Sequence, residues 1–119
     1  MKNNIKPIII RGAGDIATGT ISMLYNAGFP VIVTEISKPS AIRRTVAFSE
    51  SIYEGISSVE NIKCTLYDSF EKAYKDSLKG KLPIIVDSNL SLLNKYKPDI
   101  LIDAILAKKN IGTKKAWQN

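Results

Sequence analysis

The chain has 119 residues, of which 45% are hydrophobic, and a formal net charge of +6. This length leaves room for one domain with one hydrophobic core and excludes a separate substrate domain. A single cysteine, Cys64, and the lack of histidine exclude a disulfide framework, a His/Cys metal site and every histidine-dependent catalytic triad. The apolar run in the opening MKNNIKPIII is too short for a signal peptide or a membrane span, so we expect a cytoplasmic protein without membrane contact.

The positive charge is concentrated at the end of the chain. Four of the 17 basic residues lie in the last dozen positions, namely Lys108, Lys109, Lys114 and Lys115. No run of Lys and Arg is interleaved with aromatic residues, so nucleic acid is not the expected partner. A small phosphorylated ligand needs only two or three well-placed cations and is the partner that we expect.

The first part of the chain predicts a strand, a helix and a second strand. Residues 5–10 form a nearly continuous apolar run, which is typical of a strand buried on both faces. Residues 15–27 carry apolar side chains near helical spacing and predict a helix that ends at Gly28. Residues 29–34 are a second run of β-branched residues. Together these segments predict one βαβ unit.

The rest of the chain continues the alternation. After a loop, we expect helices at residues 46–54, 69–78 and 89–96, and strands at residues 62–66, 83–86 and 99–106. Asp68 or Ser69 is the expected cap of the second of these helices. The alternation indicates an α/β fold, with a Rossmann-like, doubly wound parallel sheet of about five strands in a single three-layer domain spanning residues 1–119.

The segment GAGDIATG, residues 12–19, matches the phosphate-binding pattern G-x-G-x-x-G/A. It follows a buried strand, opens a helix and precedes, by about 20 residues, Glu35, which stands near the position of a ribose-binding acid. We expect Gly12 to make the tight turn, Gly14 to let phosphate oxygens approach the backbone, and Ala17 to let the helix pack on the strand. The phosphate would then lie on the N–H groups that begin the helix.

Asp15 and Gly19 also lie within this segment. A carboxylate at Asp15 would repel a pyrophosphate, so Asp15 is either a plain helix cap, the reading we prefer, or the phosphate is offset or bridged by a metal ion. Gly19 lowers helix propensity by about 1 kcal/mol relative to alanine, which suggests close approach by another element or by the ligand.

Three arginines follow the first two predicted strands. Arg11 lies at the mouth of the first strand, and Arg43 and Arg44 follow the second, where guanidinium groups can contact phosphate bidentately. The alternative is a solvated basic loop.

Other reactive side chains favour structural roles. Asp87 and Asp103 lie in or just after apolar strands, where a charge needs a partner, and we expect them to pair with Lys108 or Lys109. Cys64 is expected to be a small core residue rather than a nucleophile.

Three blocks in fixed order, GAGDIATG, the glutamate of VTEISKP with the following AIRRTVAFSESIYEG, and DAILAKKNIGT, carry a family resemblance. With these blocks, the sequence resembles the YqeB-type accessory proteins of the selenium-dependent molybdenum hydroxylase system, distant relatives of the XdhC-like accessory factors. The resemblance spans residues 5–113 and implies a Rossmann-like domain with a part in maturing molybdenum enzymes. Family members continue beyond the third block, so the resemblance covers only their N-terminal half.

The resemblance also implies a set of ligand-binding positions. Combined with the residue-level interpretation, the expected nucleotide-binding residues are Arg11, Gly12, Ala13, Gly14, Asp15, Ala17, Thr18, Glu35, Arg43, Arg44 and Lys108. The expected cofactor is a nucleotide, with molybdopterin dinucleotide and NAD(P) as candidates, and the expected partners are a molybdenum hydroxylase client and a second copy of the chain.

The sequence therefore predicts a non-catalytic accessory protein that binds a nucleotide. One alternative is an NAD(P)-binding domain of an oxidoreductase, although hydride transfer needs a substrate pocket and an acid or base that this chain does not offer. The other is a structural remnant that oligomerises to cover its sheet edges.

Overall fold

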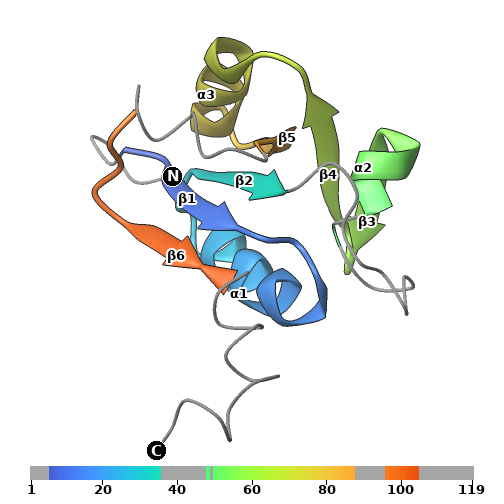
Figure 1. Ribbon diagram of the computed structural model, residues 1–119. Helices are drawn as coiled ribbons and strands as arrows, with labels where there is room; N and C mark the ends of the chain where they lie inside the picture. The colour runs from blue at the N-terminus through green and yellow to red at the C-terminus, as the bar shows by residue number, and fades with distance from the viewer. Residues whose placement is uncertain (1–5, 36–47, 49, 88–95, 105–119) are drawn as a thin grey trace, which may run out of the picture.

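The computed structural model describes residues 6–35, 48, 50–87 and 96–104, which form a mixed α/β structure (Figure 1). Its elements are, in chain order, β1 (Ile8–Arg11), α1 (Asp15–Asn26), β2 (Val31–Glu35), α2 (Glu50–Glu54), β3 (Ile56–Val59), β4 (Ile62–Tyr67), α3 (Phe70–Leu78), β5 (Leu82–Val86) and β6 (Leu101–Asp103). The strands form one six-stranded sheet in the order β3-β4-β5-β2-β1-β6. All its pairings are parallel except that of the edge strand β3 with β4.

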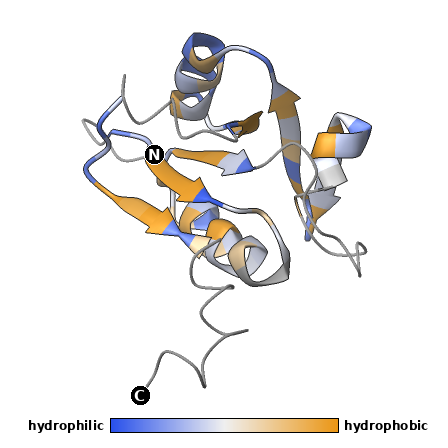
Figure 2. Cartoon of the chain, viewed as in Figure 1, coloured by the Kyte–Doolittle hydropathy of each residue, from blue (hydrophilic) through white to orange (hydrophobic). Residues whose placement is uncertain are grey.

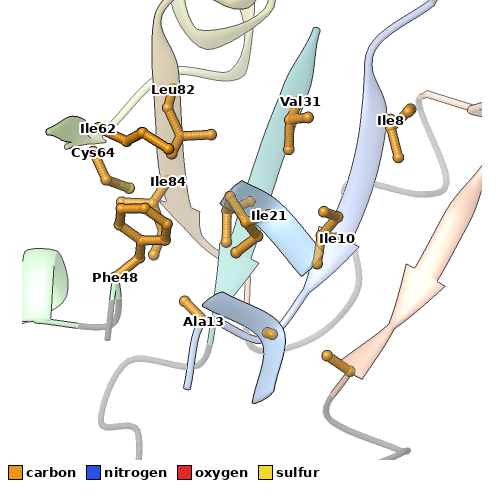
Figure 3. Close-up of a cluster of buried hydrophobic side chains, with 13 residues drawn as sticks. Ile8, Ile10, Ala13, Ile21, Val31, Phe48, Ile62, Cys64, Leu82 and Ile84 are labelled. Atoms are coloured by element: carbon orange, nitrogen blue, oxygen red, sulfur yellow. The ribbon is translucent and has the colours of Figure 1, made fainter. Parts of the chain in front are cut away.

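Helices lie on both faces of this sheet. On one face, Ile10 and Val33 belong to a buried cluster that includes Ile21 of α1, and Figure 3 shows Ile21 lying over the strands, with Phe48 beside Ile84. On the other face, Ile9, Ile32 and Ile85 are clustered with Ala73 of α3 and with Tyr96. Successive side chains of a strand point to opposite faces of the sheet. A strand that contributes to both clusters therefore needs apolar residues at successive positions. This requirement explains why most of β1 has the hydrophobic colour in Figure 2, with the hydrophilic colour only at its end, where Arg11 stands.

The end of α1 and the start of α3 lie where the local sequence predicts them. Gly28, just after the C-cap of α1, has a φ of 93°, a conformation that favours glycine. Ser69 is the N-cap of α3, and its hydroxyl accepts a hydrogen bond from the backbone N–H of Lys72. These findings confirm the helices expected at residues 15–27 and 69–78.

The expected strands are present with shifted bounds, but the sequence interpretation missed β3. More and less exposed side chains alternate along residues 56–59, and apolar and polar side chains alternate along residues 62–65. Between these segments stand Glu60 and Asn61, whose φ values are 51° and 69°. Two successive positive φ values are typical of a two-residue hairpin turn, and Asn tolerates this conformation well. The signal was present but weak, because the turn contains no glycine.

The order of the strands was not foreseen either. In a Rossmann sheet the third parallel strand lies next to the second, whereas here β5 lies between β2 and β4. The short helix expected at 46–54 is present as α2, and the one expected at 89–96 lies outside the described residues except for Tyr96. Within the described segments, no helix has both the length and the apolar character needed to cross a bilayer.

Gly19 lies in the middle of α1 and provides a test of helix stability. It is exposed, and a Cβ at this position would have nothing within 4 Å among the described residues, so the expected close approach of another element is not seen there. Gly19→Ala should therefore raise the free energy of unfolding by about 1 kcal/mol. Thermal unfolding followed by circular dichroism measures the change.

The matched control is Gly80→Ala. Gly80 also has open space around a Cβ, but its φ is +92°, so alanine should lower the free energy of unfolding through backbone strain. Equal effects of the two substitutions would contradict the assignment of Gly19 to an unconstrained helical position.

Candidate functional site

The turn between β1 and α1 lies at the carboxyl edge of the parallel strands. Gly12, the first residue after β1, has a φ of 105°, which favours glycine. Its backbone N–H donates to the carbonyl oxygen of Thr34 over 2.7 Å, which ties the start of the turn to β2. Gly12 thus makes a sharp turn while its amide remains bonded to the neighbouring strand.

The helix that follows begins without a side-chain cap. Its N-cap is Gly14, and the first intrahelical bond runs from the N–H of Thr18 to the carbonyl of Gly14 over 2.8 Å. The helical N–H groups before Thr18 therefore have no partner within α1. Asp15, expected as the cap, is instead the first helical residue, and its side chain lies outside the described part of the structure.

Glu35, the last residue of β2, is buried against this turn. Its Oε2 accepts a hydrogen bond from the backbone N–H of Ala13 over 2.8 Å, and the residue is only 6% exposed. The amides of Gly12 and Ala13 are therefore bonded within the chain, and an incoming anion would use Gly14 and the first turn of α1. Sequence reasoning placed Glu35 near the turn but did not foresee this bond.

Thr18 and Ala17 connect the turn to the core. The Thr18 hydroxyl donates to the carbonyl of Ala13 over 3.2 Å and accepts from the backbone N–H of Phe48 over 3.1 Å. Ala17 is 2% exposed and belongs to the buried cluster beneath α1. Thr18 thus fixes the turn by hydrogen bonds, and Ala17 packs the start of α1 against the core.

Arg11 is paired with an acidic residue from the neighbouring strand. Its guanidinium donates to the carboxylate of Asp103, which is the register partner of Arg11 across β1 and β6. The sequence interpretation paired Asp103 with Lys108 or Lys109, which lie outside the described residues, as do Arg43 and Arg44. The structure shows that Asp103 neutralises Arg11 where the strands end.

The ends of these strands carry more negative than positive charge in the described part of the chain. Asp87 follows β5, and its backbone N–H donates to the carbonyl of Glu35 over 2.9 Å. Of the residues that the structure describes, Glu35, Asp87 and Asp103 place carboxylates at the ends of β2, β5 and β6, and Arg11 places a guanidinium at the end of β1. Among the described residues, no three acidic or cysteine side chains gather as metal ligands would.

Cys64 lies far from this edge in the core, as expected. It is fully buried in the cluster beneath α1, near Phe48 in Figure 3, and the Ser51 hydroxyl donates to its carbonyl oxygen over 3.0 Å. Burial raises the pKa of the Cys64 thiol to about 12. A thiol that stays protonated and buried is a packing residue rather than a nucleophile.

Removing the Glu35 carboxylate should destabilise the fold. Glu35→Ala leaves the buried N–H of Ala13 without its acceptor, which costs about 1–3 kcal/mol of unfolding free energy. Glu35→Gln keeps an acceptor oxygen and should lose less. Urea unfolding of the two variants measures the difference, and equal midpoints would show that the bond to Ala13 does not stabilise the turn.

The raised pKa of Cys64 predicts a stability that falls in alkali. Unfolded Cys64 ionises near its ordinary pKa of 9.0, whereas the folded thiol stays neutral up to about 12. Between pH 8 and 9.5 the free energy of unfolding should therefore fall by about 0.8 kcal/mol. Urea unfolding at both pH values tests this, and Cys64→Ala should abolish that part of the decline. A decline unchanged in Cys64→Ala would contradict the assignment.

Comparison with known proteins finds one strong similarity. The chain is 47% identical over 107 residues to the uncharacterized protein YqeB of Escherichia coli (strain K12). These 107 residues are 90% of this chain. The chain spans about a fifth (20%) of the length of that protein, less than the half that the sequence resemblance suggested. No family model matches the chain, and no solved structure matches it. The similarity confirms the YqeB-type resemblance of the sequence.

Proposed function

We propose that this chain is a nucleotide-binding module whose Rossmann-like turn receives the phosphate. The observation that carries the proposal is the start of α1 at the carboxyl edge of the parallel strands. There a glycine turn with positive φ at Gly12 leads into a helix whose N-cap, Gly14, has no side chain. Uncapped N–H groups and the positive end of the helix dipole together favour an anion.

The neighbouring residues support a nucleotide over a bare anion. A carboxylate offers about four acceptor positions, so the bond from Ala13 to Glu35 is compatible with a ribose hydroxyl donating to the same group. The phosphate charge would compete with Asp103 for the guanidinium of Arg11. We assign the remaining positive charge for the phosphate to Arg43, Arg44 and Lys108, as the sequence and its resemblance imply.

We further propose that the module serves the maturation of a selenium-dependent molybdenum hydroxylase. Support comes from the three sequence blocks, since YqeB itself is uncharacterized. The chain would act as a non-catalytic, XdhC-like accessory protein that binds molybdopterin dinucleotide or NAD(P), with a molybdenum hydroxylase as its client. Exposed Ile100 and Leu101 at the edge strand β6 are compatible with a homodimer.

Isothermal titration against NAD, NADP, ADP, CDP and molybdopterin dinucleotides tests the binding. At least one of them should bind, and Gly14→Val should abolish that binding, because a branched side chain would occupy the place of the phosphate. Gly14 has a φ of −76° and a ψ of −167°, which valine can adopt, so the variant should fold.

The matched control is Met23→Val, which places the same residue on the exposed part of α1. It should fold and bind like the parent chain. If none of these nucleotides binds, or if folded Gly14→Val binds with undiminished affinity, the proposal is overturned.

A further inference from the structure

A hollow of about 660 Å³ lies between β4, the end of β5 and α3. This volume is in the range of small-molecule sites. Leu66, Ile85 and Val86 contribute apolar lining, and Val86 is 40% exposed although it ends a central strand. The hollow thus has an apolar surface that the described part of the protein leaves uncovered.

Tyr67 provides a fixed aromatic wall to this hollow. Its phenolic O–H donates to the carboxylate of Asp76, which also lines the hollow. Burial, together with the Asp76 carboxylate, raises the pKa of Tyr67 to about 12, so the ring stays uncharged at neutral pH. A neutral ring held by a hydrogen bond is suited to stacking with a flat heteroaromatic ligand.

Asp68 and Lys72 bring polar groups to the same hollow. Both are exposed, and among the described residues neither the carboxylate nor the ammonium group makes a hydrogen bond or an ion pair. Their available groups are an acceptor and a donor. An amino-substituted heteroaromatic ring offers the complement, since its exocyclic amine donates while a ring nitrogen or carbonyl oxygen accepts.

The hollow opens at the same edge of the sheet as the glycine turn. Tyr67 is in register with Ile85, and the next residue of β5, Val86, is in register with Glu35. Three strand intervals separate β4 from β1, which amounts to about 14 Å. An extended nucleotide that lies along the strand ends runs in this direction, from the turn after β1 toward the hollow.

We propose that this hollow binds the base of the nucleotide, and that it selects bases with an exocyclic amino group. The inference rests on the proposed function, because the phosphate is taken to lie at the glycine turn. The base stacks on Tyr67, donates its amine to Asp68 and accepts from Lys72. Placing the base beside β4 depends on the insertion of β5 between β2 and β4, which sets the distance from Glu35.

Pairs of nucleotides that differ in the amino group test this selection. In isothermal titration with the full chain, CDP should bind about fivefold more tightly than UDP, and ADP about fivefold more tightly than IDP, the effect of one hydrogen bond. Asp68→Ala should remove the preference within each pair. Glu71→Ala removes an exposed carboxylate three residues away, in the first turn of α3 and outside the lining of the hollow, and should leave the preference intact.

Two further measurements separate the base from the phosphate. Tyr67→Ala should weaken the binding of all four nucleotides. Tyr67→Phe keeps the ring and should bind them nearly as tightly as the parent chain does. Inorganic pyrophosphate should bind Asp68→Ala and the parent chain equally. Nucleotide binding without preference in the parent chain, or a preference that Asp68→Ala retains, would overturn the base site and leave the proposed function standing. No binding of any nucleotide or of pyrophosphate would overturn both.

Discussion

The structure at the carboxyl edge depends on how the turn after β1 satisfies its backbone amides. The chain must leave a buried strand and enter a helix within three residues, and every buried N–H there needs an acceptor. Thr34 and Glu35, both at the end of β2, accept from Gly12 and Ala13. The turn is therefore shaped by the neighbouring strand as much as by its own glycines. Helix α1 begins after Gly14, just beyond the two amides that β2 accepts.

This arrangement gives Glu35 two physical roles. As an acceptor for Ala13 it stabilises the turn, and as a buried carboxylate it places negative charge beside the start of α1. The helix dipole favours that charge, which explains how a buried glutamate is accommodated. The same charge would oppose a phosphate, so the proposed nucleotide site requires cationic side chains in addition to the backbone amides. The guanidinium of Arg11, at the end of β1, is already paired with Asp103.

The position of β5 determines what lies beyond the turn. Because β5 separates β2 from β4, the aromatic ring of Tyr67 and the start of α3 are moved one strand further from Glu35 than in the usual doubly wound order. The exposed Val86 and the hollow beside it follow from this placement. The strand order thus differs from the usual doubly wound order at this edge.

The sequence by itself determined most of the local elements of this protein, although not the edge strand β3. Apolar runs indicated strands buried on both faces, the glycine segment indicated a strand-to-helix turn, and Ser69 indicated the start of α3, because each signal acts between near neighbours. Only the tertiary structure decided that β5 lies between β2 and β4, that Asp103 pairs with Arg11 and that Ala13 donates to Glu35. The first of these pairs joins residues 92 positions apart. Such contacts depend on which strands become neighbours, and hydrophobic periodicity carries no information about that order.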